Sequence, residues 1–299
     1  MNKILSLYFP LFLLGFISCK DVKELPKTEI DTWQLGWRMV LNSMNENHEL
    51  ASLQLDSLMA ENEDTSSDFL GTGLESKHAL GKTDEVLIII SRLDSFQKTQ
   101  LCKKDFFTSF EICKDYKGEL VENPDLQIEL IKMYINDQYV RSNLMEDMLN
   151  KYGLKEKEVI IDSFGVATDE RNRNQLEKII QEFGFPTLKM VGKDAMDGVF
   201  YIIQHADGNK EWQAMQLSHI KKAVDNGDLE AVDYAYLYDR IKVNSGEPQL
   251  YGTQFSKVDP INRIVEFAPI EDEENVDKRR REMAMMPIDM YKKLVLNAF

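Results

Sequence analysis

The segment Gln204-His205-Ala206-Asp207 holds residue types from which a proton-transferring site can be built. Histidine changes its charge near neutral pH, and a nearby carboxylate can fix its tautomer. The segment ends a helix predicted over 192–206, and Gly208 lets the chain turn there, so both side chains can point into a cleft. If the site is catalytic, His205 would be its general base or acid. The alternatives are a histidine that only satisfies last-turn carbonyls and a metal site, for which no third ligand is evident.

Polar residues also interrupt the apolar face of a helix predicted over 125–151. Its stripe runs from Leu126 to Tyr134 and continues into Asp137, Gln138 and Arg141. Asp137 and Arg141 are four residues apart, so they can pair on one face. An inward-facing ion pair is costly, which makes these three residues candidates for ligand binding. The structural alternative is an ion pair between helices.

Asp239 and Arg240 end the apolar stripe of a helix predicted over 228–242. A guanidinium near a cleft can clamp a carboxylate or phosphate through two hydrogen bonds. Asp239 or Asp207 would then be the carboxylate that orients His205. Arg240 could equally pair with an aspartate and have only a structural role.

The segment Gln249-Leu250-Tyr251-Gly252-Thr253-Gln254 alternates like a strand that continues to Phe255. In a strand, Gln249, Tyr251 and Thr253 would share one face, and Gln254 would point the other way. These four side chains, with Gln204, are candidates for binding a polar ligand such as a sugar or a peptide. An exposed hairpin with a polar outer face is the alternative.

Apolar residues elsewhere recur mostly at helical spacing, so the fold is predicted to be mainly α. A single β-hairpin is expected, with strands at 249–255 and 264–267 and Asp259-Pro260 in the turn between them. The last helical part is interrupted at Pro287. Further helices are predicted over 31–44, 51–59, 70–80, 84–93, 168–183, 210–225 and 275–298.

The helices before residue 120 form two hairpins about 35 residues apart, a spacing that resembles tetratricopeptide repeats. Ala51 and Val86 would hold equivalent positions. Such repeats could bind a protein or peptide partner, whereas a plain helical bundle is the alternative. We therefore predict a helical-repeat-like region at 31–119 and an α-rich domain at 120–299.

The N-terminus resembles a bacterial lipoprotein signal. Residues 1–18 have one basic residue, a short apolar run and a small residue, Ser18, directly before Cys19, although Phe16 stands where Leu is usual. We expect acyl chains such as palmitate on Cys19, a tether over 19–30, and a body held to a cell-envelope membrane outside the cytoplasm. The alternative is an ordinary secretory signal with an incidental cysteine.

The net charge bears on the class of partner, and the two cysteines after Cys19 bear on whether the chain contains a disulfide. The net charge is −15, which disfavours nucleic acid as a partner, because phosphate contacts need clustered Lys and Arg. Cys102 and Cys113 are eleven residues apart, too far to bridge on one continuous helix. Since a disulfide would need a turn between them, we predict two buried free thiols. No motif calls for a cofactor.

Taken in order, these motifs resemble an uncharacterised bacterial family, one of the domains of unknown function. The resemblance covers roughly residues 120–295 and rests on the helix with Asp137-Gln138, Gly184-Phe185-Pro186, Gln204-His205-Ala206-Asp207, Tyr236 to Arg240, Gln249 to Gln254 and Arg279-Arg280. The segment Met283 to Pro287 departs from the Gly-Leu-Pro-type ending of the family. The resemblance implies a domain and a site but no reaction.

The function that these features favour is a cell-envelope lipoprotein that binds a ligand or partner in a polar cleft. The alternative is a metal-independent hydrolase in which His205 works with Asp207 or Asp239 and Arg240 stabilises an anion. No Gly-x-Ser-x-Gly elbow is present, so water would be the nucleophile. A metal-dependent protein is the least favoured class.

Overall fold

The computed structural model describes residues 31–61, 66–116, 120–139, 141, 144–159 and 165–297. Cys19, the predicted signal and the predicted tether lie outside these described residues. The described chain is mainly helical, with an antiparallel hairpin near its C-terminal end, which confirms the predicted fold class. None of its helices has the length and apolar character needed to span a membrane.

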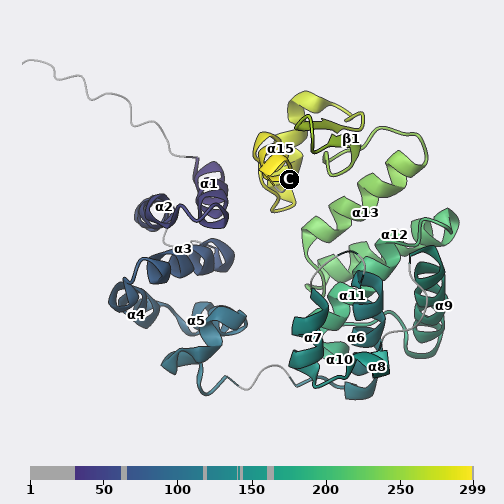
Figure 1. Cartoon of the computed structure of the whole chain (residues 1–299), viewed down its shortest axis with the longest axis horizontal. Helices are drawn as coiled ribbons and strands as arrows, with labels where there is room; N and C mark the ends of the chain where they lie inside the picture. Colours follow the sequence, from purple (N-terminus) through teal and green to yellow (C-terminus); the bar gives the residue numbers. More distant parts are fainter. Residues whose placement is uncertain are drawn as a thin grey trace, which may run out of the picture. The chain divides into compact units, whose positions relative to one another are not determined.

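The first part of the described chain consists of consecutive helices (Figure 1). Helices α1 and α3 begin 35 residues apart, at 32 and 67, and so do α2 and α4, at 48 and 83. Ala51 and Val86, predicted to be equivalent, are both fully buried. The two helical hairpins are thus confirmed, while their relation to tetratricopeptide repeats stays a prediction. The helices are α1 (Thr32–Met44), α2 (His48–Glu61), α3 (Ser67–Ala79), α4 (Thr83–Arg92) and α5 (Ser95–Cys102).

The chain turns back after α5 through two short 3-10 helices, η1 (Asp105–Ser109) and η2 (Glu111–Cys113). Cys102 ends α5 and Cys113 ends η2, and the two form a disulfide with their Cα atoms 5.3 Å apart. The prediction of two free thiols is therefore wrong. The 3-10 helices supply the turn that a bond requires and bring the Cα atoms within disulfide range.

Helix α6 (Pro124–Gln138) is the central helix of the second part and packs against α7, α8, α9, α10 and α11. Asn123 and Pro124 determine where this helix begins. The side chain of Asn123 accepts a hydrogen bond from Leu126 N at 3.1 Å, and Pro124 takes the first helical position. The surrounding helices are α7 (Leu144–Tyr152), α8 (Glu156–Val159), α9 (Val166–Phe183), α10 (Leu188–Val191), α11 (Lys193–Gln204), α12 (Lys210–Asp225) and α13 (Ala231–Asn244).

Two predicted helices have different bounds in the structure. The predicted helix 125–151 ends at Gln138, where Arg141 N donates to Gln138 O rather than continuing the helical pattern, and α7 begins at Leu144. The predicted helix 192–206 starts one residue later as α11, because Gly192 takes a positive φ of 79° and separates it from α10.

The C-terminal lobe contains the hairpin of β1 (Phe255–Asp259) and β2 (Ile264–Phe267), followed by η3 (Glu273–Asn275), α14 (Val276–Glu282) and α15 (Ile288–Asn297). The second predicted strand, the turn and the interruption at Pro287 are confirmed. The prediction of a strand over 249–255 is wrong: residues 249–254 form a loop, with a positive φ of 70° at Gly252, and β1 begins only at Phe255.

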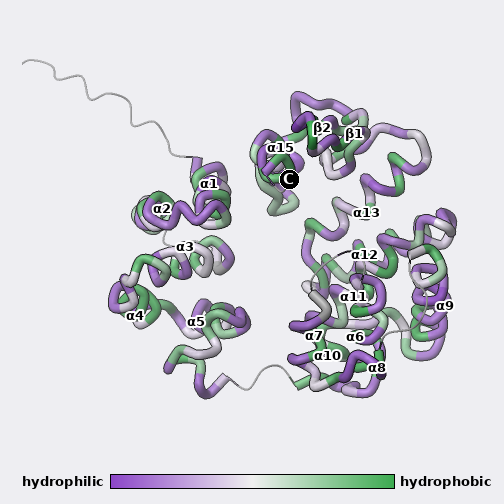
Figure 2. The backbone as a smooth tube through the Cα atoms, in the orientation of Figure 1, coloured by the Kyte–Doolittle hydropathy of each residue, from purple (hydrophilic) through white to green (hydrophobic). Residues whose placement is uncertain are grey.

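Hydrophobic and hydrophilic residues alternate along most helices of Figure 2, as one-sided burial requires. The largest core cluster lies between α6, α9, α11 and α12 and includes Leu130, Leu176, Ile203 and Ile220, each fully buried. This core fixes α6 and α11 against each other, and the candidate site lies at the ends of these two helices.

Candidate functional site at the ends of α6 and α11

Helices α6 and α11 run in the same direction and approach closely. A Cβ atom at Gly198 would lie 2.7 Å from Tyr134 Cβ and 3.5 Å from Leu130 O. About one turn further along α11, Tyr201 stacks on Tyr134 with ring centroids 5.6 Å apart. The absence of a side chain at Gly198 therefore lets the C-terminal ends of both helices meet.

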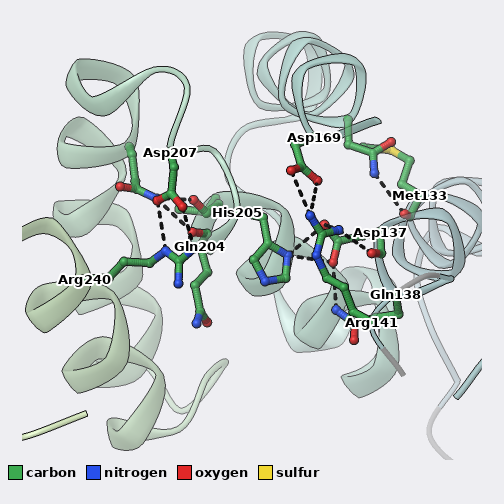
Figure 3. A network of polar contacts seen from close by, with 12 residues as sticks. Met133, Asp137, Gln138, Arg141, Asp169, Gln204, His205, Asp207 and Arg240 are labelled. Atoms are coloured by element: carbon green, nitrogen blue, oxygen red, sulfur yellow. Dashed lines mark hydrogen bonds and ion pairs between the residues drawn. The ribbon is translucent and has the colours of Figure 1, made fainter. Parts of the chain in front are cut away.

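His205 and Asp137 meet at these two ends. His205 is the C-terminal cap of α11, and its Nδ1 lies 2.9 Å from Oδ1 and 2.8 Å from Oδ2 of Asp137. An ionised carboxylate only accepts hydrogen bonds, so in a neutral imidazole this contact places the proton on Nδ1 and leaves the lone pair on Nε2. Figure 3 shows the imidazole turned toward Asp137 and away from Asp207. The described residues provide no hydrogen bond to Nε2, and the His205 side chain is 15% exposed.

Asp137 is completely buried and lies in the last turn of α6. A negative charge is unfavourable at the C-terminal end of a helix, and a buried charge needs compensation. Gln138 Nε2 donates to Asp137 Oδ2 at 2.7 Å, and Arg141 Nη1 lies 3.5 Å from Oδ1. Arg141 also donates to the Asp137 carbonyl oxygen and, through Nη2, to both oxygens of Asp169 at 2.8 Å. The predicted pairing of Asp137 with Arg141 is present, but the guanidinium is shared with Asp169.

A pocket of about 350 Å³ opens beside His205. The start of α9 forms one wall and the segment between α11 and α12 forms the other. The pocket is lined by Val166, Asp169, Glu170, Arg173, His205, Ala206, Asp207, Gly208 and Asn209. His205 therefore combines a buried carboxylate partner on one nitrogen with access to a pocket.

Asp207 is bound by Arg240 and does not contact His205. Arg240 donates from Nε to Asp207 Oδ1 at 2.9 Å and from Nη2 to Oδ2 at 2.5 Å, and Asn244 adds a hydrogen bond of 2.9 Å. Burial alone would raise the pKa of Asp207, but the hydrogen bonds and charge of Arg240 outweigh it and hold that pKa below its ordinary value. The pair joins the end of α11 to α13 and so fixes the backbone next to His205. The neighbouring Gln204 contributes its carbonyl oxygen, which accepts from Gln213 at 2.9 Å.

Asp239 points to the other side of α13, into the C-terminal lobe. It is completely buried and accepts hydrogen bonds from the backbone N–H groups of Leu250, Tyr251 and Thr253 and from Thr253 Oγ1, at 2.8 to 3.2 Å. Burial raises the pKa of the Asp239 carboxyl, and these hydrogen bonds oppose that rise. Asp239 therefore organises the 249–254 loop and makes no contact with His205.

The polar side chains of the 249–254 loop also bond within the lobe. Gln249 is fully buried and exchanges hydrogen bonds with the Gln254 backbone at 2.8 Å in both directions, and Gln254 Nε2 donates to Thr253 Oγ1 at 3.0 Å. On the opposite side of the loop, buried Arg280 donates to Tyr251 O at 2.7 Å. The carboxylate of Asp239 holds the N–H side of the loop and Arg280 holds the carbonyl side.

The structure thus brings together one part of the predicted site and separates the rest. His205 lies with Asp137, Gln138 and Arg141, while Asp207 and Arg240 form a neighbouring network, and Asp239 with the 249–254 loop belongs to the C-terminal lobe. Sequence reasoning missed Asp169 and Arg173 in the pocket wall. Asp169 is an acidic residue near a helix start, where acids are common, so its type and position gave no signal.

Within the described ranges, no three or more His, Cys, Asp or Glu side chains are grouped so that they could hold a metal ion.

A model of a family of unknown function, DUF6624, matches residues 124–299, more than half of the chain. The chain therefore belongs to this family, which confirms the resemblance seen in its motifs. No curated protein and no solved structure matches the chain.

Proposed function

We propose that this member of the family is a hydrolase in which His205, oriented by Asp137, is the general base. The observation that carries the proposal is the contact of 2.8 Å between His205 Nδ1 and Asp137, while Nε2 has no hydrogen-bond partner among the described residues and the ring lies beside a pocket. A histidine held in this tautomer by a carboxylate is the arrangement that general-base catalysis uses.

The proposed reaction needs no protein nucleophile. Nε2 of His205 takes a proton from a water molecule while the water oxygen forms a bond to the electrophilic carbonyl carbon of an acyl substrate. The bond to the leaving group then breaks, and the imidazolium returns the proton to that group. Asp137 stabilises the imidazolium that exists between the two steps.

Arg173 is the pocket residue that we assign to the developing negative charge. Its Nη1 donates to Glu177 at 3.2 Å, its Nη2 contacts Asn174, and its guanidinium lies 5.7 Å from the centroid of the Trp212 ring. A guanidinium has five N–H donors, so donors remain for a substrate oxygen. Arg240, which the sequence favoured for this role, is engaged with Asp207.

The setting that we propose is the bacterial cell envelope, with the chain anchored through lipid on Cys19. The lipoprotein-like residues 1–19 support this proposal. The disulfide between Cys102 and Cys113 supports export as well, because such bonds persist in oxidising compartments. Acyl groups of cell-envelope polymers or peptides would then be the accessible substrates.

A second candidate function is partner binding by the N-terminal helical hairpins. Leu53 on α2 and Ile88 on α4 are 35 residues apart and are 61% and 51% exposed. Leu50 and Leu87 add exposed apolar area on the same two helices. These residues favour the binding of a protein or peptide partner. A double variant with Leu53→Ser and Ile88→Ser should no longer bind that partner.

The hydrolase proposal is tested with the chain from Lys20 to Phe299 and a panel of chromogenic acyl esters, peptide amides and isolated peptidoglycan. His205→Ala and Asp137→Asn should each lower any hydrolysis by about 10²–10⁴-fold while the circular dichroism spectrum is kept. His219→Ala is the matched control, because that histidine contacts Gln216 and Phe185 and is not among the residues that line the pocket of His205. Full activity in a folded His205→Ala variant would exclude the mechanism.

A chemical probe tests His205 without a known substrate. Diethylpyrocarbonate acylates unprotonated imidazole nitrogens, and the chain has four histidines as internal comparisons. If Nε2 is free and basic, His205 should react in the native protein, and mass spectrometry of the digest should locate the added group there. An unreactive His205 would mean that Nε2 is not available to a substrate.

A further inference from the structure

Arg141 connects the dyad of Asp137 and His205 to the wall of the pocket. Its guanidinium lies 3.5 Å from Asp137 Oδ1 and makes two hydrogen bonds of 2.8 Å with Asp169. Asp169 lines the pocket beside His205. Arg141 is 28% exposed, Asp169 is 15% exposed and Asp137 is fully buried, so the chain of contacts passes from the interior to the pocket.

The charge of Asp137 needs a cation other than the imidazolium of His205. Gln138 donates a neutral hydrogen bond. Among the described residues, Arg141 is the permanently charged group within ion-pair distance of the Asp137 carboxylate. If that charge were absent, protonation of His205 would be the nearest way to balance the buried carboxylate. A protonated His205 has no lone pair with which to act as a base.

Three of the four other charged residues that line the pocket of His205 are paired with described residues. On α9, Asp169 pairs with Arg141, Arg173 pairs with Glu177, and Glu170 is exposed on the pocket wall. Asp207 pairs with Arg240 of α13.

Two tyrosines also lie near His205 in the described part of the chain. Tyr201 of its own helix stacks on it at 6.0 Å, and Tyr134 of α6 stacks on Tyr201. Burial and neighbouring acidic groups raise the pKa of both tyrosines, which keeps them neutral. Among the described residues, Asp137 is the charged group in contact with His205, and Arg141 is the cation in contact with Asp137.

We propose that Arg141 is a positioning residue that keeps Asp137 ionised while His205 stays neutral, and that Asp169 holds Arg141 at the distance this requires. This inference rests on the proposed function of His205 as a base. Two hydrogen bonds to Asp169 orient the guanidinium so that it neutralises Asp137 without displacing His205 from its oxygens. Asp169 thus acts on the dyad through Arg141.

The test is a titration of His205 by ¹H–¹⁵N NMR of the imidazole ring in the chain from Lys20 to Phe299, with no substrate present. In Arg141→Gln, the midpoint of the His205 titration should move to higher pH by about one unit, a tenfold change in the protonation equilibrium. Asp169→Asn should move it to lower pH or remove the deshielded Nδ1–H signal, because Arg141 is then free to compete for Asp137. The double variant should resemble Arg141→Gln alone.

Two further variants keep the test decisive. Arg141→Lys preserves the charge but not the paired hydrogen bonds, so His205 should titrate close to its position in the parent protein even if Arg141→Gln does not fold. Lys221→Gln removes a cation from the exposed pair with Asp225, also four residues apart, and should leave His205 unchanged. The inference is overturned if Arg141→Gln titrates like Lys221→Gln, or if the effects of Arg141 and Asp169 are additive. Because these readouts need no turnover, the inference can hold when no hydrolysis is found, and it can fail in an active enzyme.

Discussion

Replacing Asp239 with alanine should unfold the C-terminal lobe rather than remove a catalytic group. The carboxylate accepts from three backbone N–H groups and one hydroxyl, and Asp239, Tyr251 and Thr253 are all buried. Each buried N–H left without a partner costs about 1–3 kcal/mol. Three such groups give a loss of about 3–5 kcal/mol if the loop partly opens to water. Arg280 on the other side of the loop would add to the loss, because burial lowers its pKa and the charge of Asp239 is one of those that oppose this lowering.

Urea unfolding followed by circular dichroism measures this loss, and amide hydrogen exchange locates it. Exchange at Leu250, Tyr251 and Thr253 should accelerate by at least about 10²-fold, since each 1.4 kcal/mol is a factor of ten. Asp239→Asn keeps one carbonyl oxygen as an acceptor and should lose about half as much stability. The reasoning would be refuted if Asp239→Ala kept the stability of the parent within about 1 kcal/mol and yet lost hydrolysis, because Asp239 would then act in catalysis, as its sequence position suggested.

Three further variants test the fold. Burial and neighbouring carboxylates raise the pKa of Asp233 from 3.8 to about 7, so its ionisation opposes folding increasingly as the pH rises from about 4 to about 7. Asp233→Asn should therefore raise Tm most above pH 7 and change it little at pH 4. An equal shift of Tm at both pH values would contradict this. Replacing Cys102 and Cys113 with serine should cost about 3 kcal/mol, from the short loop that the disulfide closes, and reducing agent should then have no further effect on urea unfolding. Gly198→Ala brings a methyl group to 2.7 Å from Tyr134 Cβ, so it should cost about 1–3 kcal/mol and weaken the His205–Asp137 contact, seen as loss of the deshielded Nδ1–H signal in NMR.

Helical periodicity predicted most of the fold because burial of a single apolar face determines it. The stripe through Leu126 and Leu130 is buried as expected, and the two N-terminal hairpins have the predicted offset of 35 residues. The prediction of a strand over 249–255 was wrong because of contacts with residues outside this segment. The alternation of Gln249, Tyr251 and Thr253 resembles a strand, but the N–H groups of Leu250, Tyr251 and Thr253 bond to Asp239, eleven or more residues earlier, rather than to a neighbouring strand.

The site was only partly predictable, because its partners come from distant segments. His205 and Asp137 were both identified as polar interruptions of apolar faces, but their pairing joins residues 68 positions apart. Asp207 and Asp239 are nearer to His205 in the sequence than Asp137 is, so they were predicted to be its partners. Asp207 follows the cap of α11 and is directed toward Arg240. Only the parallel packing of α6 on α11, which depends on Gly198, brings Asp137 to His205.

Two fully buried carboxylates in this domain differ in the donors that surround them, and the donors indicate the role. Three of the four donors to Asp239 are backbone N–H groups, which do not change charge in solution, so this carboxylate fixes a loop. The partners of Asp137 are side chains, and one of them is a histidine with its second nitrogen beside a pocket. Asp137 also lies at the helix end where a negative charge is disfavoured. An asparagine could accept a hydrogen bond there at lower electrostatic cost, but it would not stabilise an imidazolium. The placement of Asp137 is therefore best explained by the charge that it provides to His205.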